Sequence, residues 1–212
     1  MSHNRKIMNT IDFQKQFQPY QVFSLQDIKK FFPDFSYRQI DRWEKKGYLI
    51  KIKQGFYTLS DQNISQSFSF LVANRIYHPS YVSLEKALKY YGLIPEEVFQ
   101  ITSISTKKTA EFDTSVGNFG YRHISPKLFW GYQLVKTSNS KFLIAEPEKA
   151  ILDYLYQNPR LNTVDDFEGM RINEDSFAEY IDIKKFQRYL DAFNNKALTK
   201  RVNTFLNTIK ND

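Results

Sequence analysis

The pattern of residues 24–59 constrains the fold of this chain more than any other stretch. Apolar residues recur at three-residue spacing after Ser24, a residue type that caps helix N-termini, and this spacing predicts a short helix with one buried face. A second amphipathic segment follows Ser36, with Ile40 and Trp43 on its apolar side. A Pro-Asp pair lies between the two segments. We therefore expect two short helices joined by a tight turn.

Two short runs rich in β-branched and aromatic residues, 48–52 and 56–59, follow Gly47, which ends the second helix. Lys-Gln-Gly separates the runs, so they predict a β-hairpin. Two helices, a tight turn and a basic hairpin are the outline of a winged helix-turn-helix, a module that reads DNA with its second helix. The same elements could instead form an ordinary small domain whose lysines keep it in solution.

Polar and basic side chains cover the face of the second helix opposite Ile40 and Trp43. Arg38 and Arg42 are four residues apart, so both lie on this face, and we expect one to contact a guanine edge and one a phosphate. Trp43 follows Ile40 by three residues, which favours a place in the core over insertion between bases. The full set of predicted DNA-binding residues is Tyr37, Arg38, Gln39, Arg42, Lys45, Lys51 and Lys53.

Positive charge is concentrated at the N-terminal end. Residues 1–60 contain 11 Lys and Arg against 5 Asp and Glu, a net charge of +6. The whole chain contains 30 basic and 23 acidic residues, so the other 152 residues hold 19 basic and 18 acidic side chains, a net of +1. A localised excess of one charge predicts a partner of opposite charge better than a diffuse excess does. Double-stranded DNA is therefore the expected partner of the N-terminal segment.

The chain has 212 residues, which is enough for two small domains, and we place them at residues 1–62 and 63–212. Aromatic residues make up 17% of it, which predicts a packed core. The absence of cysteine excludes disulfides, thiolate metal sites and cysteine nucleophiles. No run approaches the roughly 18 consecutive apolar residues of a membrane span, and the N-terminus lacks the apolar core of a signal peptide. We therefore expect a cytoplasmic protein with no membrane partner.

The second predicted domain mixes two kinds of apolar spacing. Residues 98–121 alternate, which predicts strands with Gly117 and Asn118 at a hairpin turn. Helical segments precede this stretch and resume at Pro147, and residues 183–209 predict two further amphipathic helices. The predicted fold class is therefore α+β: an N-terminal winged helix-turn-helix followed by a mixed α+β domain with a helical C-terminal tail.

Several blocks within residues 23–156 occur in an order that is typical of one known family. The blocks are FSLQDIKKFFPDFSYRQIDRWEKKGYLIKIKQGFYTL, YVSLEKALKYYGLIPE, ITSISTKKTAEF leading into GNFGYRHI, and IAEPEKAILDYLY. Together they resemble the AbiEi-type antitoxins of bacterial type IV abortive-infection toxin-antitoxin systems. The order of the blocks carries the resemblance, because SLEKAL or EPEKA alone is weakly specific.

The resemblance implies a winged-helix domain that binds inverted repeats in its own promoter and represses its operon. Because one chain offers one recognition helix, reading an inverted repeat requires two copies on the operator. The resemblance also implies a second domain that counteracts a nucleotidyltransferase-like toxin. Type IV systems are described as lacking a stable toxin-antitoxin complex, so no tight interface with the toxin is expected. The alternative functions are a winged-helix protein-interaction module and an orphan transcriptional regulator without a toxin.

The sequence offers no catalytic, metal-binding or cofactor-binding constellation, so we expect no enzyme activity, no metal and no cofactor. Its three histidines are far apart, and its seven glycines form no phosphate-binding loop. The acidic residues beside Pro147 are expected to stabilise the start of a helix.

His123 is expected to be a strand histidine with a backbone partner rather than a substrate contact. If the chain were instead an enzyme acting on nucleic acid or on the toxin, residues 106–109 and His123 would be its site. A solvated hairpin face explains the basic residues of that segment equally well. The candidate antitoxin surface comprises Lys107, Lys108, Arg122 and His123.

Overall fold

Apolar residues in the first 60 positions gather helices and strands around an aromatic core. In the computed structural model, which describes residues 9–138 and 140–210, three helices of this first unit pack on an antiparallel sheet of strand order β1-β3-β2. Trp43 is 4% exposed and its ring lies 4.8 Å from that of Phe13, which confirms its predicted place in the core. The elements are α1 (Thr10–Phe17), β1 (Phe23–Ser24), α2 (Leu25–Phe31), α3 (Tyr37–Lys45), β2 (Leu49–Lys53) and β3 (Phe56–Leu59).

Local hydrogen bonds fix where α2 begins. The Ser24 hydroxyl accepts a hydrogen bond from the Asp27 amide (3.1 Å), and the Asp27 carboxylate accepts one from the Ser24 amide (2.9 Å). This reciprocal pair is a capping box, and it confirms Ser24 as the N-cap. Ser36 lies at the N-cap of α3, but its side chain makes no capping hydrogen bond. The start of α2 is therefore fixed more firmly than the start of α3.

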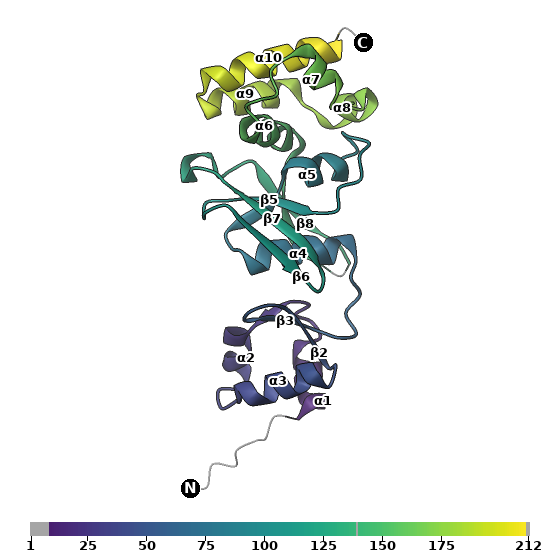
Figure 1. Ribbon diagram of the computed structural model, residues 1–212, viewed down its shortest axis with the longest axis vertical. Helices are drawn as coiled ribbons and strands as arrows, with labels where there is room; N and C mark the ends of the chain where they lie inside the picture. The colour runs from purple at the N-terminus through teal and green to yellow at the C-terminus, as the bar shows by residue number, and fades with distance from the viewer. Residues whose placement is uncertain (1–8, 139, 211–212) are drawn as a thin grey trace.

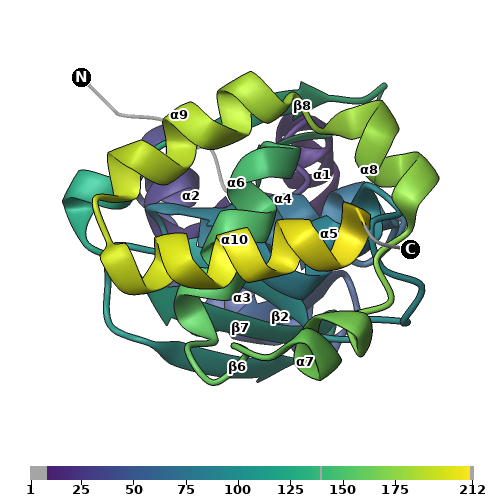
Figure 2. The same cartoon turned by 90° about the horizontal axis from the view of Figure 1, so that it is seen from above.

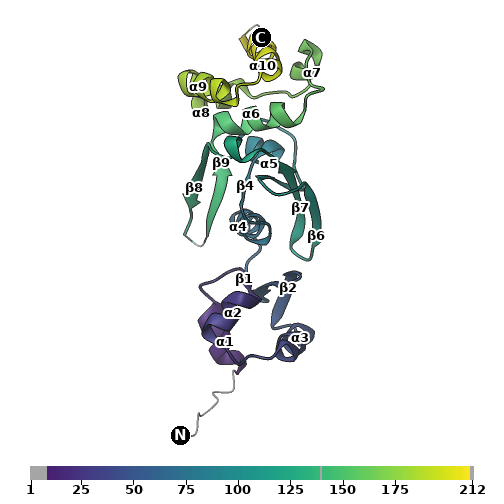
Figure 3. The same ribbon diagram turned by 90° about the vertical axis from the view of Figure 1, so that its left-hand side faces the viewer.

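Residues 66–157 form a six-stranded mixed sheet with helices on both of its faces. The strand order is β6-β7-β5-β4-β9-β8, in which β5 pairs parallel with β7 and β4 pairs parallel with β9. α4 lies between the two arms of the sheet, and α5 and α6 cross its opposite side (Figure 3). This mixture of helices and strands confirms the predicted α+β class. The elements are α4 (Gln66–Ile76), β4 (Ser80–Val82), α5 (Leu84–Tyr90), β5 (Ile101–Ser105), β6 (Ala110–Thr114), β7 (Gly117–His123), the 3-10 turn η1 (Pro126–Leu128), β8 (Tyr132–Lys136), β9 (Lys141–Ala145) and α6 (Pro147–Gln157).

The predicted position of the hairpin turn in this sheet was wrong. Gly117 and Asn118 lie within β7, and Gly117 is paired with Thr114 of β6, so the turn consists of Ser115 and Val116. The Thr114 hydroxyl donates a hydrogen bond to the Gly117 carbonyl (2.8 Å) and accepts one from the Val116 amide (3.2 Å). These bonds place the turn at residues 115–116, two residues before the predicted position at Gly117 and Asn118. β4 and β8 were not predicted, because both are short and neither alternates cleanly between buried and exposed residues.

The helices that follow the sheet cover α6 at the end of the molecule farthest from the first unit (Figure 1). Seen from that end, α9 and α10 lie across α6 (Figure 2). They confirm the two amphipathic helices predicted for the C-terminal tail, and Asn194, with φ +47°, ends α9 at the predicted break. Within the described residues, no helix has the length and apolar character to cross a membrane. The elements are α7 (Val164–Glu168), α8 (Glu174–Tyr180), α9 (Ile183–Phe193) and α10 (Lys196–Lys210).

Apolar contacts, an ion pair and hydrogen bonds attach the first unit to the sheet. Val22 and Ile52 belong to the first unit in sequence. Their side chains are nevertheless buried in the core of the second unit, which consists of the sheet and the helices from α4 onward. The Arg75 guanidinium on α4 lies 3.0 Å from the Asp27 carboxylate, which joins α4 to the capping box of α2. Apolar burial and this ion pair help to orient the first unit, which lies on the α4 side of the sheet in Figure 3.

The acidic residues beside Pro147 join α6 to α9. Pro147 occupies the first turn of α6, as the sequence predicted, and Glu148 lies in the same turn. Lys185 Nζ on α9 lies 3.4 Å from the Glu146 carboxylate and 3.0 Å from that of Glu148. The Tyr189 hydroxyl also donates a hydrogen bond to Glu146. These carboxylates therefore hold a neighbouring helix in addition to their favourable place at a helix N-terminus.

An ion pair lies inside the second unit with no access to solvent. Lys149 and Asp153 are one turn apart on α6, and the side chains of both are 0% exposed. The Asp153 carboxylate also accepts hydrogen bonds from the hydroxyls of Tyr81 (3.0 Å) and Ser83 (2.9 Å). Burial raises the pKa of Asp153 and lowers the pKa of Lys149, and the attraction between the two groups opposes both shifts. The pair therefore ties α6 to β4 and to the start of α5.

Replacement of Asp153 by Ala is expected to lower the free energy of unfolding by about 3–5 kcal/mol, because the Lys149 ammonium would stay buried without a counter-charge. Urea denaturation followed by circular dichroism measures this change. Glu97→Ala, which removes an exposed ion pair with Lys89, is the control and should cost less than about 1 kcal/mol. Equal losses in the two variants would contradict a special role for the buried pair.

Candidate nucleic-acid interface

α3 turns its basic side chains away from the rest of the molecule. Ile40 and Trp43 face the core, so Arg38 and Arg42 point outward, and both are exposed. Within the part of the chain that the structure describes, neither guanidinium has an ion-pair partner. Arginines without a carboxylate partner are available to an external anion such as a phosphate. The structure therefore places the two principal predicted contacts on one accessible helix face.

The basic residues of α3 border a shallow hollow of about 510 Å³. Arg38, Arg42, Lys45 and Lys46 line the hollow together with Asp41, four cations against one carboxylate. Guanidinium and ammonium groups around such a hollow can hold phosphate oxygens, and an arginine can also reach a base edge. The structure thus brings together the three cations predicted on this helix and adds Lys46, its C-cap residue. Lys46 was not among the predicted residues, although its spacing of four residues from Arg42 could have indicated it.

Two further predicted residues, Tyr37 and Gln39, lie at the start of α3 at different depths. Tyr37 is 53% exposed, and its ring packs edge-on against that of Phe35 with the centroids 5.2 Å apart. Lys29 Nζ lies 5.6 Å from the centre of the Tyr37 ring, within the range of a cation-π contact. Gln39 is half-buried. Tyr37 is therefore accessible to a ligand on this face, and Gln39 is less so.

The two predicted hairpin lysines have different surroundings. Lys51 is exposed, and its backbone carbonyl accepts a hydrogen bond from Ser115 Oγ at the tip of the β6–β7 hairpin (2.9 Å). Lys53 Nζ lies 3.5 Å from the centre of the Phe112 ring and also donates to a backbone carbonyl at the end of α4 (3.4 Å). Burial, and then the charge of Lys107, lower the pKa of Lys53. Lys53 therefore attaches the first unit to the second, and these contacts favour a structural role over the predicted phosphate contact.

The four residues of the candidate antitoxin surface come from β7 and from the loop between β5 and β6. His123 Nδ1 lies 3.0 Å from the backbone carbonyl of Lys107, and Lys108 follows in the same loop. This contact confirms His123 as a strand histidine with a backbone partner. Successive side chains of a strand point to opposite faces, so Arg122 points the other way, where it lies 3.9 Å from Glu111. His123 therefore lies against the loop that contains Lys107 and Lys108, and Arg122 points to the other face of the strand.

No family model matches the chain, and no curated protein matches it. Among the described residues there is also no group of three or more His, Asp or Glu side chains placed to hold a metal ion. The basic face of α3, with four cations around one hollow, is the feature that bears most directly on binding.

Lys51→Ala and Lys53→Ala are expected to have different effects. Loss of Lys51 should reduce the slope of log affinity for DNA against log salt by about 1, because one phosphate contact is removed. Lys53→Ala should leave that slope unchanged and reduce stability by roughly 0.5–2 kcal/mol, because a cation-π contact is lost. Fluorescence anisotropy at several salt concentrations and thermal unfolding measure the two effects. If Lys53→Ala reduced the slope and Lys51→Ala did not, these different roles of the two lysines would be wrong.

Proposed function

We propose that this protein is a DNA-binding autorepressor and the antitoxin of a type IV toxin-antitoxin operon. The observation that carries the DNA-binding part is the basic face of α3, with four cations around an open hollow. The absence of an ion-pair partner for Arg38 and Arg42 among the described residues supports it further. The antitoxin part comes from the ordered sequence blocks that resemble the AbiEi-type family.

The order of helices and strands in the first unit supports a winged helix-turn-helix. A short turn separates α2 from α3, the β2–β3 hairpin follows α3, and β1 pairs with β3. In helix-turn-helix proteins the second helix of the motif lies in the major groove. We therefore assign α3 as the recognition helix, with Arg38 and Arg42 at base edges and phosphates and with Lys45 and Lys46 at phosphates. Lys51 supplies the phosphate contact of the hairpin.

Two copies of the chain occupy the operator in this proposal. Each copy carries one α3, and an inverted repeat presents two half-sites related by a two-fold axis. Adjacent major grooves on one side of a duplex are about 34–36 Å apart, so the two recognition helices bind with that separation or a multiple of it. Occupancy of the promoter then reduces transcription of the operon, including that of the gene for this chain.

Charge reversal of Arg38 and Arg42 tests the DNA-binding part. Gel-shift titration should show preferential, salt-sensitive binding of the wild-type protein to the DNA upstream of its own gene over a scrambled duplex. Arg38→Glu combined with Arg42→Glu should weaken binding at least about 100-fold, because two base or phosphate contacts become repulsive. Both side chains are exposed, so the thermal unfolding of the variant should be unchanged.

A matched control separates the recognition face from net charge. Arg188→Glu combined with Lys200→Glu alters the net charge by the same amount on exposed residues of α9 and α10, and it should bind operator DNA like the wild type. Similar losses in both double variants would contradict the assignment of α3. Binding to a partner that changes little with salt, with no preference for the upstream DNA, would instead support a protein-interaction module.

The antitoxin part is tested by growth of cells that express the neighbouring gene of the operon. Co-expression of this protein from an unrelated promoter should restore growth, and so should the Arg38→Glu/Arg42→Glu variant, because the proposed antitoxin role belongs to the second unit. Lys107→Glu combined with Lys108→Glu should reduce the rescue, since these residues carry the charge of the candidate antitoxin surface. Failure of the wild-type protein to restore growth would exclude the antitoxin role and leave an orphan regulator.

A further inference from the structure

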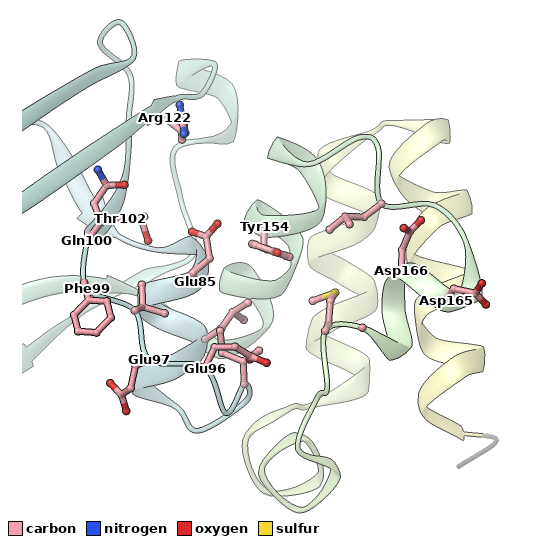
Figure 4. Close-up of a pocket in the computed structure, with 16 residues that line it drawn as sticks. Glu85, Glu96, Glu97, Phe99, Gln100, Thr102, Arg122, Tyr154, Asp165 and Asp166 are labelled. Atoms are coloured by element: carbon pink, nitrogen blue, oxygen red, sulfur yellow. The ribbon is translucent and has the colours of Figure 1, made fainter.

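An open groove of about 860 Å³ lies between the sheet and the C-terminal helices. Figure 4 shows Glu97 and Phe99 on one side, Asp165 and Asp166 of α7 on the other, and Tyr154 of α6 between them. Its volume lies within the range of ligand-binding pockets, and its open form can accommodate a segment of chain. The apolar part of its lining comes from Leu88, Ile94, Val98, Leu161 and Met170.

The groove is acidic although the chain as a whole has a net charge of +7. Five carboxylates line it against one guanidinium, that of Arg122. Burial, followed by the charges of Glu85 and Glu96, raises the pKa of Tyr154, because ionising the phenol would add another negative charge beside them. The charged residues that line the groove are therefore mostly acidic, whereas those that line the hollow on α3 are mostly basic.

The carboxylates of the groove can exchange their present partners for those of a ligand. Glu97 lies 3.1 Å from Lys89, and Glu96 lies 3.7 Å from Arg171. The Glu97 and Arg171 side chains are 73% and 71% exposed, and exposed ion pairs contribute little to stability. Asp165 forms no ion pair with any residue that the structure describes. Cations of a bound ligand can therefore replace the existing partners at small cost.

Phe99 adds an apolar contact at the edge of the groove. Its side chain is 90% exposed, whereas Phe31, the next most exposed phenylalanine among the described residues, is 41% exposed. Exposed aromatic residues beside a pocket are typical anchors of protein–protein interfaces. An apolar floor, carboxylates on both walls and an aromatic edge together match a chain segment that is both apolar and basic.

We propose that this groove binds an amphipathic Lys- or Arg-rich segment of a partner protein. The apolar side chains of the segment pack on the floor and on Phe99, and its cations pair with carboxylates of both walls, Glu97 and Asp165 among them. DNA does not fit as the occupant, because the carboxylates repel phosphates. The inference rests on the groove alone and is independent of the DNA-binding and antitoxin roles proposed above.

Fluorescence anisotropy with the full chain and a labelled synthetic peptide tests the proposal. The peptide has Leu at helical spacing and Lys at its other positions, and the control peptide has Gln in place of each Lys. Gln is chosen because a Glu-rich peptide could bind the basic face of α3. The Lys peptide should bind at low salt and more weakly at physiological salt, and the Gln peptide should bind much less.

Groove variants locate the binding. Glu97→Lys combined with Asp165→Lys should weaken binding of the Lys peptide at least about tenfold, since attraction becomes repulsion at both walls, and Phe99→Ser should weaken it as well. The control Glu174→Lys/Glu179→Lys makes the same charge change on exposed residues of α8 and should bind like the wild type. Both double variants should still bind operator DNA, so a failure here is distinguishable from a failure of DNA binding.

Three results would overturn the proposal. The first is the absence of binding by the Lys peptide, and the second is an equal loss in the groove variant and the α8 control. The third is self-association of the wild-type chain in sedimentation that disappears in the groove variant without any peptide binding, because a second copy of the chain would then be the occupant.

Discussion

The second unit depends on one buried pair of charges. Burial of an ammonium or a carboxylate is unfavourable unless the charged group has close partners. Lys149 and Asp153 are partners of one another. Because Asp153 also binds Tyr81 and Ser83, α6 lies where it can reach β4 and the start of α5. The centre of the Phe193 ring lies 4.9 Å from Lys149 Nζ, so α9 also contacts this buried ion pair. The acidic groove borders α5 and α6, so its width depends on these contacts as well.

Sequence patterns predicted the features whose causes lie within a few residues. The cap at Ser24 and the inward side of Trp43 follow from local spacing, and both were confirmed. The long-range contacts that were missed depend on distant partners, whereas the position of the β6–β7 turn and the role of Lys46 were missed although their causes are local. Lys149 meets Tyr81, 68 residues away, and Lys53 meets an aromatic ring of β6, and neither contact leaves a local pattern. For the same reason the accessible face of α3 could be predicted, whereas the acidic groove, assembled from separate segments, could not.

The β2–β3 hairpin contributes to two surfaces at once. Ile52 and Lys53 hold it against the second unit, whereas the Lys51 side chain stays exposed. A hairpin fixed in this way gives α3 a defined direction relative to the sheet, which a flexible linker alone would not provide. A duplex bound along α3 would therefore have a defined orientation relative to the second unit. The contact between the two units is thus part of the geometry of the proposed complex.

Charge is separated along the long axis of the molecule. α3 lies in the unit at one end, and the groove lies toward the other end, beside α5 and α7 (Figure 1). Such a distribution is a permanent electric dipole, which experiences a torque in an external field before any contact forms. Near a polyanion this torque turns the basic end toward the polyanion. In the proposed complex, a larger fraction of diffusional encounters would therefore begin with α3 facing the duplex, most of all at low ionic strength.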